Sequence, residues 1–197
     1  MQLQSLDTMA RTYSHVVPNI YSELDIGEEP ELPADVSFTR GEVIRAQLPS
    51  PLVYDVPYTE DEQLPHFESP IVPVMSSRLV TALRKLGVDN LQLFPAELCN
   101  LQTGQVWKDF FAVNVVGLIS CTSSLSDAAE VATRPGGGKL LTINELVIDA
   151  AKAAGAPIFR LAESPSKILL ATDILDAFDR TAPPGGWGIT AYPTRNV

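Results

Sequence analysis

The stretch "VMSSRLVTALRKLGVDNLQLFP", residues 74–95, predicts a strand, a capped helix, a short turn and a second strand. Ser76 or Ser77 can cap the helix, because a serine hydroxyl accepts a hydrogen bond from a free amide of the first turn. Gly87 ends the helix. The apolar residues at helical spacing are Leu79, Ala82, Leu83 and Leu86. Because so short a helix is marginal alone, we expect its apolar stripe to lie on a sheet.

A second stretch, "LLATDILDAFDRTAPPGGWGITAYP" (169–193), repeats this pattern, with "PPGG" breaking the helix before the final strand. When the numbering is shifted by 95 residues, Ser77 aligns with the expected cap Thr172, Leu79 with Ile174, Ala82 with Ala177 and Leu83 with Phe178. With three more residues in the second turn, Phe94-Pro95 aligns with Tyr192-Pro193. We therefore expect two similar strand–helix–strand units on a common sheet. They arise either by true duplication or by convergence on a common supersecondary unit.

The rest of the chain favours strands, being rich in β-branched and aromatic residues. "SFTRGEVIRAQL" (37–48) predicts two short strands around Arg40-Gly41. "IVPVM" (71–75) predicts an edge strand because of its proline, and "SSLSDAAEVA" (123–132) predicts a short helix. The fold expected is α+β: a strand-rich single domain with a few short helices packed on a mixed or antiparallel sheet.

The length of 197 residues and the hydrophobic fraction of 45% favour one domain with a substantial core. Within it, residues 1–70 are expected to form an acidic, proline-rich, extended N-terminal lobe packed on an α+β core over 71–197. Nine of the sixteen prolines lie in the first 75 residues. Apolar residues such as Phe38, Ile44 and Tyr54 recur there, which argues for an ordered layer over the core and against a disordered tail.

The net charge of −10 comes entirely from the first 75 residues, which hold thirteen acidic and three basic side chains. A nucleic-acid-binding protein shows the opposite sign, because it must neutralise phosphates. A localised acidic surface suits a basic protein partner, and simple solubility is the alternative explanation.

Cysteine usage and hydropathy favour a cytoplasmic protein. Cys99 and Cys121 are expected to be reduced thiols, since two cysteines form no disulfide framework and no C-x-x-C pair occurs. The N-terminus lacks the basic start and apolar run of a signal peptide, and no apolar run approaches the roughly 18 residues that span a bilayer. We expect no membrane association.

Residues typical of catalysis are few. His15 and His66 are the sole histidines, and each is expected to be structural. "RPGGGKLL" lacks the first glycine and the final hydroxyl of a phosphate-binding loop, and "SPSK" (164–167) has a proline where a serine–lysine pair needs a helix. The acidic run at 60–62 lacks the spacing of a calcium loop. We therefore expect no cofactor, no metal and no enzymatic activity.

Several segments together resemble immunity protein family eleven of bacterial polymorphic toxin systems, long catalogued as a domain of unknown function. The segments that carry the resemblance are "VMSSRLVTALRKLGVDNLQLFPAEL", "FFAVNVVGLISC", "PIFRLAESPSKILLATDILDAF" and "GWGITAYP". It covers residues 70–193 well and 11–70 loosely. The family has an aspartate-bearing stretch after the "NV" strand, where this chain has Ser120 and Cys121, so no role of that acid is carried over.

The resemblance implies a mostly β, α+β domain that protects a toxin-producing cell, with no catalytic residues. We expect an immunity protein that neutralises a cognate toxin by stoichiometric occlusion, acting as a monomer or homodimer. The residues expected to contact a basic toxin surface are Glu28, Glu29, Glu31, Glu60, Asp61, Glu62 and Trp187. Trp187 can instead close the end of the sheet.

Two other classes of function stay open. A hydrolase that reverses toxin damage would use His66, Cys121 or Ser164, the three faint candidates for a base or nucleophile. A structural or oligomerising module would act without any toxin.

Overall fold

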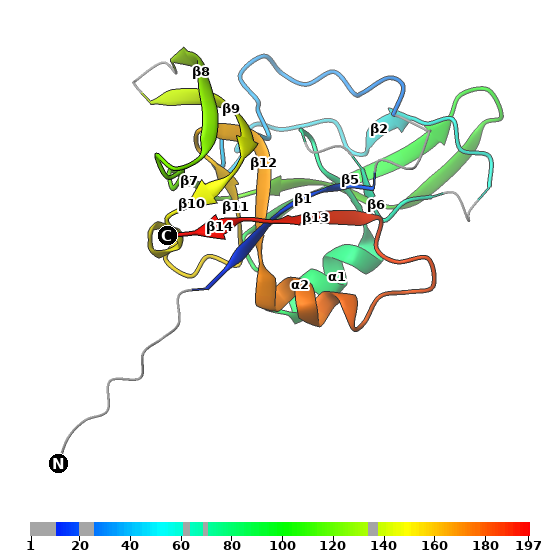
Figure 1. Cartoon of the computed structure of the whole chain (residues 1–197). Coiled ribbons are helices and arrows are strands. Elements are labelled where there is room, and N and C mark those ends of the chain that lie inside the picture. The colour runs from blue at the N-terminus through cyan, green and yellow to red at the C-terminus, as the bar shows by residue number, and fades with distance from the viewer. Residues whose placement is uncertain (1–10, 20–25, 61–63, 69–70, 134–137) are drawn as a thin grey trace.

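The computed structural model describes residues 11–19, 26–60, 64–68, 71–133 and 138–197 (Figure 1). The strands are β1 (Tyr13–Pro18), β2 (Leu52–Asp55), β3 (Phe67–Glu68), β4 (Val74–Ser76), β5 (Leu91–Asn100), β6 (Gln105–Val115), β7 (Leu118–Ile119), β8 (Asp127–Thr133), β9 (Lys139–Glu145), β10 (Val147–Ile148), β11 (Ile158–Leu161), β12 (Ser164–Ala171), β13 (Ile189–Pro193) and β14 (Arg195–Asn196). The helices are α1 (Ser77–Lys85), α2 (Thr172–Asp179) and a 3₁₀ turn (Ala150–Ala153). The fold is α+β and strand-rich, as the sequence predicts.

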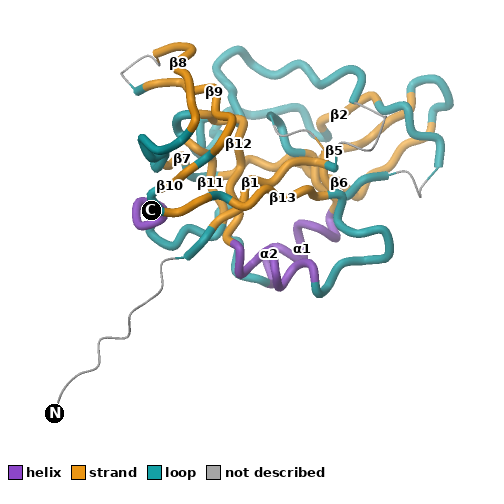
Figure 2. The backbone as a smooth tube through the Cα atoms, viewed as in Figure 1, coloured by secondary structure: helices purple, strands orange, loops and turns teal. Residues whose placement is uncertain are grey.

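Two five-stranded mixed sheets form the body of the protein (Figure 2). Sheet A has the order β13-β1-β12-β11-β7, and sheet B has the order β2-β5-β6-β4-β3. Each sheet contains one parallel pair, β11 with β7 in sheet A and β2 with β5 in sheet B, while the other pairs are antiparallel. Among the described strands, β8 with β9 and β10 with β14 form two smaller ribbons.

Helix α1 begins and ends as the sequence predicts. The Ser76 hydroxyl accepts a hydrogen bond from the Leu79 amide at 3.2 Å, so Ser76 is the cap. Gly87, with a φ of 87°, follows the helix end at Leu86. The helix connects β4 to β5, and both of these strands lie against β6. Its buried residues Leu79, Val80 and Leu83 pack into the core.

Helix α2 connects β12 to β13, and both of these strands lie against β1. The prediction that Thr172 caps this helix is wrong: Thr172 is its first residue, and Ala171 holds the capping position with no side-chain hydrogen bond. Ile174 and Phe178 are buried, at the positions that align with Leu79 and Leu83. The two helices lie side by side on the same side of the molecule (Figure 1).

Sheet B separates two hydrophobic cores. The larger core contains residues of both sheets and both helices, and the smaller one lies on the opposite face of sheet B. Alternate residues of β6 show the division, with Val113 and Val115 in the larger core and Phe110 and Ala112 in the smaller. The smaller core is covered by apolar side chains of segment 26–60, including Phe38.

The part of the chain before residue 71 contributes strands to both sheets. Strand β1 lies between β12 and β13 inside sheet A, β2 is an edge strand of sheet B, and β3 is its other edge. Between β1 and β2, described residues 26–51 form no strand or helix. This part is therefore woven into the sheets as well as lying over the smaller core.

Three further local predictions are wrong. Residues 37–48 form no strand, although Gly41, with a φ of 67°, does make the turn expected there. The strand expected over 71–75 is β4, which lies between β6 and β3 and is not an edge. Pro73 precedes β4, where its missing amide removes no ladder bond.

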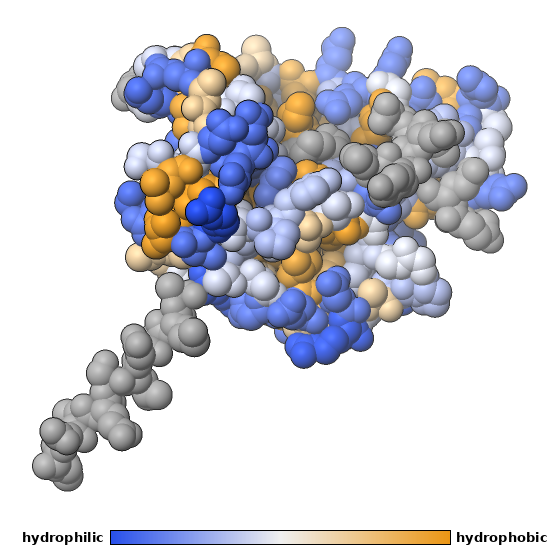
Figure 3. All heavy atoms as spheres, viewed as in Figure 1, coloured by the Kyte–Doolittle hydropathy of each residue, from blue (hydrophilic) through white to orange (hydrophobic). Residues whose placement is uncertain are grey.

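The segment predicted as a helix at 123–132 overlaps strand β8, which pairs with β9 in an antiparallel hairpin. Every residue of β8 is exposed, and Val131 is 63% exposed. Figure 3 shows hydrophobic residues at the surface of this hairpin. The alternation that marks a half-buried strand is therefore absent from β8.

Within the described residues, no helix is long and apolar enough to cross a membrane.

Candidate functional site

The acidic residues expected to meet a partner lie on the surface. Glu28, Glu29, Glu31 and Glu60 are all exposed, and we call these four residues the acidic surface. Asp61 and Glu62 lie outside the described residues. Exposure is what contact with a partner requires of these four side chains.

One of these residues, Glu28, is fixed beside the edge strand β2. The Gly27 amide donates to the Asp55 carbonyl at 2.8 Å, and the Asp55 amide donates to the Glu28 carbonyl at 2.9 Å. A Cβ atom on Gly27 would lie 3.0 Å from the Asp55 Oδ2 atom, so glycine permits the close approach. This pairing holds the Glu28 backbone against β2.

The charge of Glu29 reaches the buried Tyr54 of β2. Burial, with a smaller contribution from Glu29, raises the pKa of the Tyr54 phenol. Among the described residues, no salt bridge involves any carboxylate of the acidic surface. Their charge is thus available to a cation from outside the chain.

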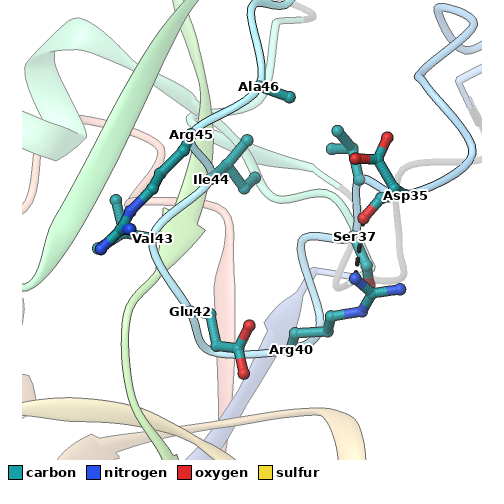
Figure 4. A pocket seen from close by; sticks show the side chains of 9 residues that line it. Asp35, Ser37, Arg40, Glu42, Val43, Ile44, Arg45 and Ala46 are labelled. Atoms are coloured by element: carbon teal, nitrogen blue, oxygen red, sulfur yellow. Dashed lines mark hydrogen bonds between the residues drawn. The ribbon is translucent and has the colours of Figure 1, made fainter.

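A cavity of about 530 Å³ lies within the loop that follows, lined by residues between Asp35 and Ala46 (Figure 4). The Arg40 side chain donates to the Asp35 carbonyl at 2.8 Å and closes one side of the loop. Arg40 and Arg45 extend to opposite sides of the loop (Figure 4). With Asp35 and Glu42 also in the lining, the cavity has mixed charge, which selects neither anions nor cations.

Two side-chain amides hold this loop on sheet B in place of strand pairing. The Ile44 backbone amide donates to the Gln92 Oε1 atom at 2.9 Å, and the Gln92 Nε2 atom donates to the Ile44 carbonyl at 2.7 Å. The Asn114 amide donates to the Glu42 carbonyl at 2.7 Å and to the Gln92 Oε1 atom at 3.1 Å. Asn114 is the asparagine of "AVNVV". Sequence reasoning noted it in the resemblance without finding this role, for which a polar residue inside an apolar strand is the signal.

Trp187 is a buried residue at the junction of both helices. It is 6% exposed, and its ring stacks on Phe178 with centroids 4.6 Å apart. Its indole N–H donates to the Phe178 carbonyl at 3.1 Å. The rings of His66 and Trp187 meet edge to face, and the Arg78 guanidinium lies 5.8 Å from the indole centroid. These contacts favour the structural interpretation of Trp187, because a partner anchor would have to leave them.

His66 lies beside a serine that sequence reasoning treated as a helix cap alone. The His66 Nδ1 atom and the Ser76 hydroxyl are 2.7 Å apart. Burial, followed by the charge of Arg78, lowers the pKa of His66, which favours the neutral imidazole that a general base requires. Both residues line a cavity of about 530 Å³. Ser76 is 6% exposed and caps α1 at the same time.

The other faint candidates for catalysis are poorly placed. Cys121 is fully buried, and this burial raises the pKa of its thiol to about 12, so the reactive thiolate is disfavoured. Ser164 and Lys167 lie on strand β12, where side chains three residues apart point to opposite faces. The serine–lysine pair that needs one turn of a helix does not form there.

Within the described residues, no group of three or more metal-ligating side chains gathers in one place.

A scan of the chain against protein-family models matches no family, and a search of curated proteins finds no match.

Proposed function

We propose that this chain is an immunity protein, which binds a cognate bacterial toxin in the cytoplasm and neutralises it by covering its surface. The observation that carries the proposal is the acidic surface, four exposed carboxylates without a salt bridge among the described residues. The resemblance of the segments quoted above to an immunity family supports the same proposal.

The acidic surface suits a basic partner for two physical reasons. Exposed carboxylates of one sign accelerate the encounter with an oppositely charged protein by roughly 10- to 1,000-fold. They also disfavour acidic proteins, because like charges brought together are repelled. A stable complex needs roughly 1,600 Å² of total buried area, a size that a protein of 197 residues can provide.

The test measures association with the product of the toxin gene beside this one. A variant with Glu28, Glu29, Glu31 and Glu60 replaced by glutamine should associate more slowly, by roughly tenfold or more at low salt. The matched control replaces four exposed aspartates elsewhere, Asp89, Asp109, Asp176 and Asp179, by asparagine, which changes the net charge equally. Equal slowing in both variants would remove the acidic surface from the account.

The second candidate is a hydrolase, which the Ser76–His66 pair favours through its 2.7 Å separation beside a cavity. In this case Ser76 would be the nucleophile and His66 its general base. His66→Ala separates the two proposals. If the protein acts by occlusion, the variant still binds the toxin and protects cells. If it acts as a hydrolase, the variant no longer protects cells, and protection by the wild type requires no complex with the toxin.

We also propose that the fold contains two equivalent units. The first consists of β3, β4, α1 and β5, with β6 inserted between β4 and β5. The second consists of β11, β12, α2 and β13, with β1 inserted between β12 and β13. Along the chain β6 follows β5 directly, whereas β1 precedes all other elements of its unit.

The strand registers support this equivalence. Ser76 pairs with Phe110 and Ala171 with Tyr13, and Ser76 and Ala171 are the capping residues of the two helices. Three more cross-strand pairs of the first unit have a counterpart at the aligned positions of the second. Met75–Phe111 corresponds to Leu170–Ser14, Pro95–Phe111 to Pro193–Ser14, and Phe94–Ala112 to Tyr192–His15. A shared connection alone would leave these registers free to differ.

A further inference from the structure

The exposed face of α1 has an electrostatic character opposite to that of the acidic surface. Helix α1 has the sequence SRLVTALRK, which contains three basic residues and no acidic one. Arg78, Arg84 and Lys85 are exposed, and no salt bridge among the described residues involves them. A positive patch is therefore localised on a protein whose net charge is −10.

A cavity of about 390 Å³ lies on this face, between α1 and the segment that follows α2. Arg78 and Lys85 both line it, seven positions apart, which places them on the same side of the helix two turns from one another. Arg84 does not line it. The volume lies within the range of about 300–1,000 Å³ typical of small-molecule sites.

The rest of the lining is apolar or carries hydroxyl groups. Leu86 and Trp187 contribute apolar surface, and Thr81 and Thr181 contribute hydroxyls. Trp187 is fixed by stacking on Phe178, and Arg78 lies 5.8 Å from the indole centroid. The Thr181 hydroxyl donates to the Phe178 carbonyl at 3.0 Å, so its oxygen is held in place as well. A lining that combines two cations with apolar surface is complementary to an anion that has an apolar body.

We propose that this cavity binds a small organic anion, an aromatic or branched aliphatic carboxylate. Arg78 and Lys85 supply charge-assisted hydrogen bonds to the carboxylate, and the apolar surface of Trp187 and Leu86 receives the apolar body. The site is distinct from the acidic surface, and it stands whether or not the chain is an immunity protein.

The test is a titration with 3-phenylpropionate, followed by the indole N–H signals in a ¹H–¹⁵N spectrum. The chain has two tryptophans, and only Trp187 lines this cavity, so Trp107 serves as an internal control. The Trp187 signal should shift saturably with a Kd below about 10 mM, while the Trp107 signal stays in place. Binding should weaken as salt is raised, because the cations are exposed.

Matched variants and probes decide the outcome. Arg78→Gln with Lys85→Gln should raise the Kd roughly tenfold or more, and Arg84→Gln should change it less than about twofold. 3-Phenylpropionamide, which lacks the charge, should bind roughly tenfold more weakly, and inorganic phosphate should fail to displace the acid because it lacks the apolar body. No saturable shift, equal binding of acid and amide, or an equal effect of Arg84→Gln would overturn the proposal. Cooperative thermal unfolding of each variant verifies that the substitutions leave the fold intact.

Discussion

At the scale of single residues, Arg160 is the least expected feature of the core. It is fully buried in β11, and its guanidinium donates to the Pro165 carbonyl at 2.7 Å and to the Ile71 carbonyl at 3.1 Å. Burial lowers its pKa to about 10, so the group is still charged at neutral pH. The side chain therefore joins sheet A to the segment that leads into β4.

Replacing this residue should destabilise the protein strongly. Arg160→Met removes a buried guanidinium and leaves two partly buried carbonyl groups without these donors, and each lost hydrogen bond to a charged group costs about 1–3 kcal/mol. We expect the free energy of unfolding from urea titration at pH 7 to fall by about 2–5 kcal/mol. Arg84→Met, at an exposed position of α1, should change it by less than about 0.5 kcal/mol. Equal effects of the two variants would contradict this role for Arg160.

His15 makes the stability depend on pH. Desolvation, and then the charge of Lys167, lowers the pKa of His15 to about 4, whereas an unfolded histidine titrates near 6.5. Between these values the unfolded chain binds the extra proton, so stability is complete above about pH 6.5 and is lost as the pH falls towards 4. The groups around His15 in its cavity are Lys167, Arg195, Glu145 and Tyr192.

His15→Gln should therefore remove part of the acid sensitivity. Because one pKa unit corresponds to about 1.4 kcal/mol and the ring is partly exposed, we expect wild type to lose about 2–3 kcal/mol more than the variant between pH 6.5 and 4. Urea titrations of both proteins at the same pH values give this difference, in which the carboxylates that titrate in both proteins cancel. Parallel stability curves would show that His15 titrates normally in the folded protein.

At the scale of secondary-structure elements, the two helices differ in their caps. Ser76→Ala removes the hydroxyl that bonds the Leu79 amide and should lower the free energy of unfolding by about 1 kcal/mol. Ser77→Ala, one residue later, should lower it by less than about 0.5 kcal/mol, since Ser77 is the first helical residue and not the cap. Urea titration of the pair checks the assignment, and a larger loss at Ser77 would reverse it.

The sequence predicted best those elements whose partners are close along the chain. Helix α1, with its cap and apolar stripe, and the strand that follows it, β5, were predicted because residue spacing is a local signal. Strand β8 was mistaken for a helix because alanine and glutamate are good helix formers, and its pairing with β9 depends on tertiary structure.

Segment 37–48 was mistaken for strands because the groups that hydrogen-bond to its backbone are side chains far away in the sequence. The amides of Gln92 and Asn114 satisfy its backbone, and nothing within the segment itself encodes them. The exposure of the acidic surface was predictable from the carboxylates themselves, since charged side chains are rarely buried unpaired. The Ser76–His66 contact was not, because it depends on the pairing of β3 with β4.

At the scale of the whole molecule, the proposal of two equivalent units predicts how the chain can be reconnected. In a circular permutant, a flexible linker joins Val197 to Arg11, and the chain is opened between β5 and β6 at residues 101–104. In the permutant, β1 follows β13 along the chain, as β6 follows β5 in the native protein. Strand β6 then precedes the other elements of the first unit, as β1 precedes those of the second unit in the native protein.

We expect this permutant to unfold cooperatively and to retain native circular dichroism, with a loss of no more than about 3 kcal/mol, because its strand pairs are unchanged. The control carries the same linker and is opened between β8 and β9. If the control folds and the β5–β6 permutant does not, the first unit needs a continuous connection that the second lacks, and the units are not equivalent.

The central proposal is that the protein acts by covering a partner and catalyses no reaction. Titration of a fixed amount of the cognate toxin with this protein, with residual toxin activity as the readout, measures this most directly. Occlusion predicts that toxin activity falls linearly as this protein is added. The activity should reach its minimum at about one mole of this protein per mole of toxin. Recovery from toxin damage at a small fraction of one equivalent, repeated as fresh substrate is supplied, would show turnover and contradict the account.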